Sequence, residues 1–248
     1  MIAATLGCTI TFTIPVGMGM LKSGDRLLFS RGMLIGTGTL PVTMIVGGLL
    51  SGLSFLQIVL QSLPVLLFCF LLMFGIWRFP EQTVRAFTVF ADVIRLLTTI
   101  GLIAGAFCYM TGFSLLPDLA PLEDAMAVVS SIGIVLLGSL PTAELLQRVL
   151  KKPLSFIGRK TGMNDSSAAG LLMGIVSPVP AITMMEKMDE RGKIVNAAFL
   201  VSAASTIAAH MGFTFGTDPD FVVPLLVAKL AGGIAAVCAA LFFTKKSA

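Results

Sequence analysis

Apolar runs, most of them close to 20 residues long, recur along this chain and are separated by short polar segments. The runs are Met1–Leu21, Met33–Leu50, Ile58–Trp77, Leu96–Phe113, Ala125–Val149, Ala168–Met185, Ile194–Phe213 and Phe221–Phe243. A membrane-spanning helix needs about 20 apolar residues, and in lipid its backbone must be satisfied internally. The pattern therefore predicts an all-α integral membrane protein, a polytopic helical bundle with about seven spans. Phe79–Arg95, where charged and apolar residues alternate, is predicted to be an interfacial amphipathic helix.

The composition supports a membrane domain. Of the 248 residues 56% are hydrophobic and 12% are charged, and the mean hydropathy is +0.97. About a quarter of the residues in a soluble domain carry charge. We interpret residues 1–248 as a single transmembrane domain. Met1 opens into an apolar run without the basic segment of a signal peptide, so we expect N-terminal spans to be missing from this chain.

The basic residues are concentrated in some of the loops. With a net charge of +4 they do not indicate nucleic-acid binding, because they lie between apolar runs. The loops around Lys22–Arg31, Arg78–Arg95 and Arg148–Lys160 are basic, whereas Pro117–Asp124 carries only acidic residues. Under the positive-inside rule this order alternates between the two sides of a membrane. The alternation fails at Ala168–Met185, since a simple crossing would place Lys187, Arg191 and Lys193 outside.

A proline break divides that run. Ser177 precedes Pro178, Val179 and Pro180, and neither proline has a backbone N–H to donate. If the run enters the membrane and returns to the same side, the charge conflict disappears, so we predict a re-entrant hairpin that turns here. A proline-kinked full span remains the alternative. Transporters expose broken backbone to a solute, so Ser177, Pro178 and Pro180 are candidate substrate-binding residues.

Polar residues in other runs provide further candidates. Ser202, Thr206 and His210 are spaced by four, which places them on one face of a helix. This face either lines a cavity or packs against another helix through small residues. His210 favours the cavity, because an ionisable group in a span indicates function. Lys229 lies inside the last run, where it either snorkels to the interface or meets a partner inside the bundle.

The first run contains a second set of hydroxyls. Thr11 and Thr13 precede Pro15, and we take them as candidate substrate-binding residues beside another broken helix. Leu6–Arg26 and Gly174–Arg191 also look alike, since each has a central proline and a charged end. Internal repeats are common in transporters, but one match in apolar sequence leaves the question open.

The sequence argues against several chemistries. The cysteines Cys8, Cys69, Cys108 and Cys238 lie in apolar runs without a CxxC pattern, and His210 is the single histidine, so we expect no metal and no cofactor. An intramembrane serine protease would need His210 as its base, and no GxSxG sequence is present. We therefore predict that the chain is not an enzyme.

Several segments resemble the EutH family of ethanolamine-utilisation permeases. The sequences MDERGKIVNAAF (188–199) and AHMGF (209–213) carry the resemblance most specifically, and ITFTIPVGMG near the start is similar to the middle region of that family. The resemblance covers essentially the whole chain, which corresponds to about the C-terminal three-fifths of a family member.

The resemblance implies a multi-pass permease of the bacterial inner (plasma) membrane that moves ethanolamine inward for its catabolism. The alternatives are a carrier of another small amine or metabolite, and a membrane scaffold that does not transport. The expected partners are the small-molecule substrate and the lipid bilayer. The coupling ion and the formation of a homo-oligomer are left open.

Overall fold

The computed structural model describes residues 1–113 and 160–244, together with isolated positions between 126 and 158. Regular structure within these residues is helical, which confirms the all-α prediction for them. Five helical stretches there are long and apolar enough to cross a membrane: Ser23–Leu50, Phe55–Arg78, Pro80–Thr111, Glu190–Phe215 and Pro219–Phe243. The run Ala125–Val149 and the acidic loop Pro117–Asp124 lie outside the described residues, apart from isolated positions. The expected number of spans stays a prediction.

The N-terminal segment is helical but not regular. Two π-helical turns, η1 (Ala3–Gly7) and η2 (Thr9–Thr13), lead into the short helix α1 (Ile14–Met20). Pro15 lies in the first turn of α1, where its missing N–H breaks no helical hydrogen bond. The predicted run Met1–Leu21 is thus mainly one short apolar helical stretch, Ala4–Met20, whose first part is π-helical.

The next span is two helices in series. α2 (Ser23–Gly38) and α3 (Leu40–Leu50) meet at Thr39, and Pro41 opens α3. Because Pro41 has no N–H for the Thr37 carbonyl, that carbonyl accepts a hydrogen bond from the Cys69 thiol at 3.0 Å. α2 starts before the predicted run, so part of the expected basic loop is helical.

Two long helices follow. α4 (Phe55–Arg78) starts with a capping box between Ser54 and Gln57. α5 (Pro80–Thr111) is a continuous helix of 32 residues that ends at Gly112, whose φ is 70°. The predicted interfacial segment Phe79–Arg95 is thus helical and continuous with the span that follows it, and its place at the interface stays a prediction.

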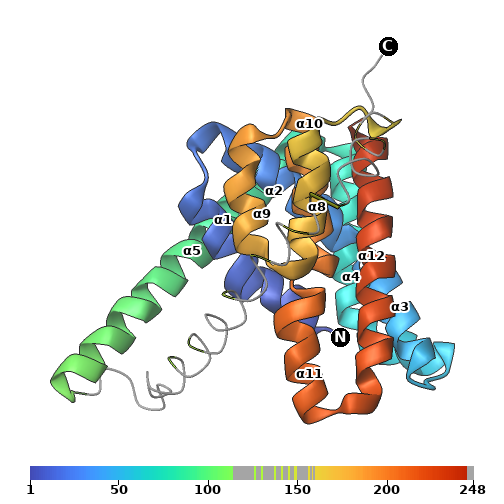
Figure 1. Cartoon of the computed structure of the whole chain (residues 1–248), viewed down its shortest axis with the longest axis horizontal. Helices are drawn as coiled ribbons and strands as arrows, with labels where there is room; N and C mark the ends of the chain where they lie inside the picture. Colours follow the sequence, from blue (N-terminus) through green and yellow to red (C-terminus); the bar gives the residue numbers. More distant parts are fainter. Residues whose placement is uncertain are drawn as a thin grey trace.

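The run with the proline break forms a helical hairpin. α8 (Asp165–Val176) and α9 (Pro178–Met184) lie side by side (Figure 1), and the 3-10 turn η3 (Met185–Lys187) follows. The Asn164 side-chain amide donates to the Lys187 carbonyl at 2.9 Å, so the two ends of the hairpin meet.

The last third of the chain crosses the bundle twice. α10 (Glu190–Ala203) is followed by the π-helical turn η4 (Thr206–His210) and by α11 (Met211–Thr217). The 3-10 turn η5 (Pro219–Phe221) then reverses the chain into α12 (Val222–Phe243). α10 is the centre of the fold: it packs on α2, α8 and α12, and every residue from Ile194 to Ala203 is buried.

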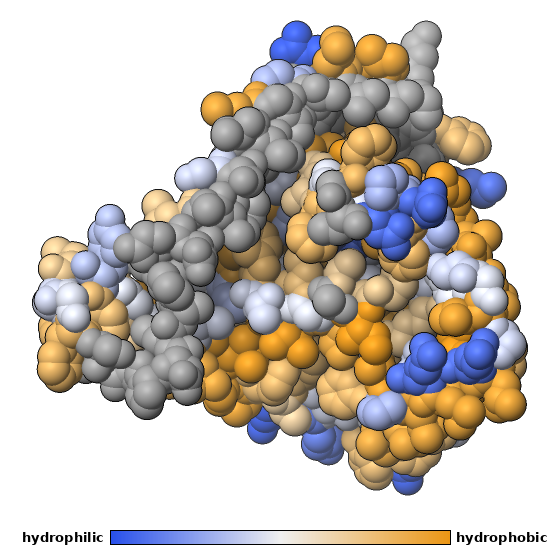
Figure 2. Space-filling model, turned by 90° about the horizontal axis from the view of Figure 1, so that it is seen from below, coloured by the Kyte–Doolittle hydropathy of each residue, from blue (hydrophilic) through white to orange (hydrophobic). Residues whose placement is uncertain are grey.

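Small residues allow α2 and α10 to approach closely. A side chain at Gly32 would overlap the Ile194 carbonyl, and one at Gly36 would overlap the Ala198 carbonyl. Away from this contact the bundle exposes large apolar side chains, including Leu56, Phe70 and Leu102. Seen from the end that carries α11, much of the described surface is hydrophobic (Figure 2). Such a surface suits a lipid environment.

Charged residues gather where α2 and α10 begin and where α4 and α12 end; we call this the basic end. Lys22 pairs with Glu186 at 2.9 Å, and Lys193 pairs with Asp25 at 2.6 Å. Arg31 donates to the Phe243 carbonyl at 3.0 Å. The segment that contains Lys187, Arg191 and Lys193 therefore lies at the same end as the first basic segment, although α8 and α9 intervene.

Gly36 provides a test of the α2–α10 contact. We expect Gly36→Ala to lower the free energy of unfolding by about 1–3 kcal/mol, because the new methyl group meets backbone that cannot rotate away. Thermal unfolding of the purified protein in detergent measures the change. Gly101→Ala is the matched control, since a methyl group there meets no described atom within 4 Å. Equal unfolding temperatures for the two variants would contradict the packing argument.

Candidate solute-binding site at two helix breaks

The turn of the α8–α9 hairpin is a backbone break at Ser177. This residue is extended, with φ −157° and ψ 140°, and its side chain is buried. A continuous helix would pair the Gly174 carbonyl with the N–H of residue 178, but Pro178 has none. The Gly174 carbonyl instead accepts from the Ser205 amide at 3.1 Å. A second chain segment thus satisfies the group that the proline leaves open.

Ser205 belongs to a second break, between α10 and η4. Ala204 has ψ 138°, and Ser205 has φ 55°, the one positive φ of a non-glycine residue in the part of the chain that the structure describes. The carbonyls freed here are capped locally. The Thr206 hydroxyl donates to the Ala203 carbonyl at 2.6 Å, and His210 Nδ1 donates to the Ala204 carbonyl at 3.1 Å.

This break corrects one sequence-based prediction. Ser202, Thr206 and His210 do not share one face of a continuous helix, because the helix stops between the first and the second of them. Ser202 and Thr206 are both fully buried, whereas His210 is partly exposed. The three residues are near the break because the chain is interrupted between Ser202 and Thr206, and their spacing along a helix does not explain it.

The N-terminal π-helical turns pack against the end of α10. Thr9 donates to the Val201 carbonyl at 3.4 Å. Thr13 is fully buried, and its hydroxyl has no hydrogen-bond partner among the described residues. Thr11 is exposed and donates to the Gly7 carbonyl of its own helical turn at 2.9 Å. Of the two predicted threonines, Thr13 faces the bundle and Thr11 faces outward.

Lys229 is fully buried inside the bundle, so the snorkelling alternative is wrong. Its ammonium donates to the Ala4 carbonyl at 3.1 Å. One turn later on α12, Gly232 leaves room for a buried hydroxyl pair in which Thr43 donates to Ser202 at 3.1 Å. α3, α10, α12 and η1 thus contribute polar groups to one region of the core.

The structure places five of the nine predicted residues at the two breaks: Ser177, Pro178, Ser202, Thr206 and His210. Ser177 and Pro178 are joined to the α10 break through Gly174, and Ser202 and Thr206 flank that break. The residues predicted to bind substrate did not include Thr9, Thr43 or Ser205. The missing N–H of Pro178 was a signal that a distant donor was needed, although nothing local identified Ser205 as that donor.

A polar network joins the two ends of the hairpin. Asn164 caps α8 and Asp189 caps α10, and the backbone N–H of Asn164 donates to Asp189 Oδ1 at 2.9 Å. The Ser167 hydroxyl donates to Asp189 Oδ1 at 2.6 Å. Partial burial favours the neutral carboxyl, but the hydrogen bonds from Ser167, Asn164 and Gly192 outweigh it and hold the pKa of Asp189 below its usual value.

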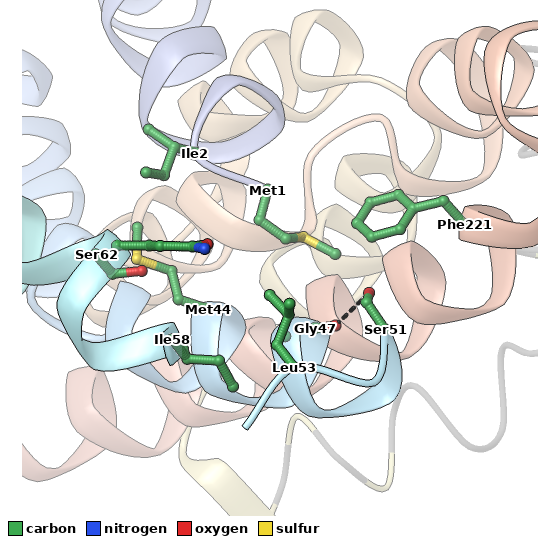
Figure 3. A pocket seen from close by; sticks show the side chains of 11 residues that line it. Met1, Ile2, Met44, Gly47, Ser51, Leu53, Ile58, Ser62 and Phe221 are labelled. Atoms are coloured by element: carbon green, nitrogen blue, oxygen red, sulfur yellow. Dashed lines mark hydrogen bonds between the residues drawn. The ribbon is translucent and has the colours of Figure 1, made fainter. Parts of the chain in front are cut away.

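A cavity beside the N-terminal segment lies away from the two breaks. A cavity of about 390 Å³ is formed at the end opposite the basic end, between Met1, Met44, Ser51, Ile58 and Phe221 (Figure 3). None of the predicted substrate-binding residues lines it. Among the described residues no group of three or more His, Cys, Asp or Glu side chains could hold a metal ion.

Discontinuous helices that meet inside an apolar bundle define a class of multi-pass membrane proteins in which the breaks face a solute. The chain belongs to the family described as "Ethanolamine utilisation protein, EutH", whose model matches residues 1–243. It is thus a multi-pass bacterial membrane protein. No solved structure matches it.

Individual relatives give the same assignment. The "Probable ethanolamine permease EutH" of Listeria monocytogenes is 37% identical over 245 residues, and the protein of the same name from Escherichia coli is 33% identical over 268 residues. The alignments cover 99% of this chain and 66% of each relative, so the chain spans slightly less than two thirds of their length. "Uncharacterized protein YxeR" of Bacillus subtilis is 32% identical over 239 residues.

The hairpin network gives a prediction on pH and stability. We expect Asp189→Ala to lower the free energy of unfolding at pH 7 by about 1–3 kcal/mol, since hydrogen bonds to a charged group are lost. Because the folded pKa of Asp189 is lowered, its contribution is present above its ordinary pKa near 3.9 and is lost as pH falls through the folded value.

Thermal unfolding of both proteins from pH 7 down to pH 3 measures this difference, which should shrink below about pH 4. Asp220→Ala is the control, because Asp220 is exposed on η5. A difference between parent and Asp189→Ala that does not change with pH would show that the carboxylate charge has no part in the network.

Proposed function

We propose that this chain forms the solute-conducting core of a permease that carries ethanolamine inward across the bacterial inner membrane for its catabolism. The observation that carries the proposal is the meeting of two helix breaks at the hydrogen bond from Ser205 to Gly174. Broken backbone inside a membrane domain is tolerated where protein surrounds it or where it lines a wet cavity. Relatives named probable ethanolamine permeases supply the solute class.

The groups around the breaks suit a protonated amino alcohol. An ammonium has three N–H donors, and a hydroxyl both donates and accepts. Pro180 cannot donate to the Val176 carbonyl, which leaves an acceptor at the hairpin turn. The buried hydroxyls of Thr13, Ser202 and Thr206 add further partners. We assign them to solute binding, and we assign Ser177 and Pro178 to the shape of the turn.

Lys229 has a different role in this proposal. Lys229 is the one charged residue among the buried residues that the structure describes. No aspartate or glutamate is among those buried residues. The Lys229 ammonium already bonds to a backbone carbonyl, the kind of acceptor that the solute ammonium requires. Lys229 therefore competes with the solute for carbonyl oxygens, and it moves aside when the solute binds. His210 caps the Ala204 carbonyl at the second break, so its ring is held next to the carbonyls freed there.

We place the α8–α9 hairpin as a re-entrant element that enters from the basic end, which faces the cytoplasm. The contacts of Asn164 with Lys187 and Asp189 support this placement, since both ends of the hairpin meet there. The five candidate spans, the run Ala125–Val149 and the N-terminal segment would give about seven spans. The 390 Å³ cavity at the opposite end then serves as the outer vestibule.

Uptake of labelled ethanolamine tests the proposal. Expressed in cells without their own carrier, the 248-residue chain should raise uptake at low micromolar ethanolamine and acidic pH, where the amine is charged and diffuses poorly. The Listeria monocytogenes relative serves as the comparison protein. Competition by other small amines tests the alternative solutes. No uptake by a correctly inserted chain would overturn the proposal for this chain.

The hairpin turn gives a second prediction. Pro178→Ala restores an N–H that competes with Ser205 for the Gly174 carbonyl, so the two breaks should separate. We expect the half-saturating ethanolamine concentration to rise about tenfold, equivalent to ~1.4 kcal/mol, without loss of membrane insertion. Pro64→Ala is the control, because Pro64 lies inside α4 at an exposed position. If both variants keep the parent's uptake, the turn does not contribute to binding.

A further inference from the structure

Helices in the two halves of the chain end at equivalent positions. α2 ends at Gly38 and α10 at Ala203, and α4 ends at Arg78 and α12 at Phe243, a shift of 165 residues in both cases. The same shift relates the break at Thr39 to the break at Ala204. Two coincidences in where a helix ends and one in where a helix is interrupted indicate a common unit, residues 14–78 and 179–243.

The sequence follows the same shift without a gap. Residues 14–26 read IPVGMGMLKSGDR, and residues 179–191 read VPAITMMEKMDER. Identical residues fall at Pro15 and Pro180, Met20 and Met185, Lys22 and Lys187, and Arg26 and Arg191. The first of these pairs places Pro15 of α1 at the position that Pro180 holds in α9.

Equivalent elements also touch each other. Gly32 of α2 packs against Ala197 of α10, and Gly36 packs against Val201, so each residue meets its own counterpart. α1 and α9 are in contact as well. Parallel repeats are related by a symmetry axis along the membrane normal, and two equivalent helices next to that axis contact each other through equivalent residues.

Ion pairs link the two units at the basic end. Lys193 Nζ lies 2.6 Å from Asp25 Oδ1, and both side chains are largely buried, with 13% and 18% of their surface exposed. Lys22 and Glu186 form a second, exposed pair at 2.9 Å. In each pair one residue belongs to residues 14–78 and the other to residues 179–243. The 390 Å³ cavity lies at the other end of the bundle.

We propose that residues 14–78 and 179–243 are two copies of one unit and that the Asp25–Lys193 pair is the inner gate between them. The inference rests on the proposed transport function. In this structure the gate is closed and the vestibule is open. Opening requires the two copies to separate at the basic end, so the buried pair must break, together with the hydrogen bond from Arg31 to the Phe243 carbonyl. The exposed pair contributes less, because water screens it.

Cross-linking the gate tests the proposal. In a cysteine-free background, Asp25→Cys and Lys193→Cys are joined by a bifunctional methanethiosulfonate reagent, and ethanolamine uptake is measured before and after reduction. We expect at least a tenfold loss of uptake that reduction reverses. Ser54→Cys with Gln57→Cys is the matched control, since both residues belong to the start of one helix. Unchanged uptake in a fully cross-linked gate would overturn the proposal.

A second readout needs no solute, so it separates failure of the gate from failure of the transport assignment. A reporter, Ser177→Cys, is labelled in inside-out vesicles with an impermeant maleimide. Asp25→Asn should raise the labelling rate at least fivefold, and the exchange of charges in Asp25→Lys with Lys193→Asp should restore the parent's rate. Equal rates in all three proteins would overturn the gate even where ethanolamine is transported. Absent uptake with the expected labelling would overturn the solute assignment alone.

Discussion

The hydrogen bond from the Ser205 amide to the Gly174 carbonyl joins two interruptions that would each be unfavourable alone. A buried backbone group without a partner costs about 1–3 kcal/mol. Pro178 creates such a group at the end of α8, because it has no N–H to donate. Ser205 holds a positive φ, which costs on the order of 1 kcal/mol or more, and this conformation leaves its amide free to reach another segment. Each break supplies the partner that the other one needs, so both persist inside the bundle.

Local signals explain what the sequence predicted and where the prediction stopped. The two prolines and the misplaced basic residues predicted a chain reversal at Ser177, and the structure has a helical hairpin there. The break at Ala204 had no such signal, since the surrounding alanines favour a continuous helix. Its cause is a contact with Gly174, thirty residues away in the chain, which local propensity cannot report. In α5 a change in amphipathic pattern predicted an interfacial segment that leads into a span, and the structure joins the two in one helix, because no residue ends it before Gly112.

The candidate site shows the same limit at the level of single side chains. Thr9, Thr11 and Thr13 alternate in the sequence, yet Thr9 and Thr13 are buried and Thr11 is exposed, because residues four apart share a helical face. For Lys229 the sequence left an even choice between the interface and the interior. The Ala4 carbonyl decides it, together with the room that Gly232 leaves beside Thr43 and Ser202. Residue types indicated which groups were polar, whereas the packing of η1 and α12 determined which of them meet.

The two halves of the chain share the positions at which their helices end but not the chemistry of their breaks. At Thr39 a proline in the next turn keeps α2 and α3 within one span, and the freed Thr37 carbonyl is satisfied by Cys69 of α4, inside the same unit. At Ala204 the break is tied to α8, which precedes the second unit. A displacement of η4 and α11 therefore acts on the hairpin through Gly174, and the hairpin base carries Asp189 at the start of α10, four residues before Lys193. The break at Thr39 has no such described link to the hairpin, because its freed carbonyl is satisfied inside its own unit.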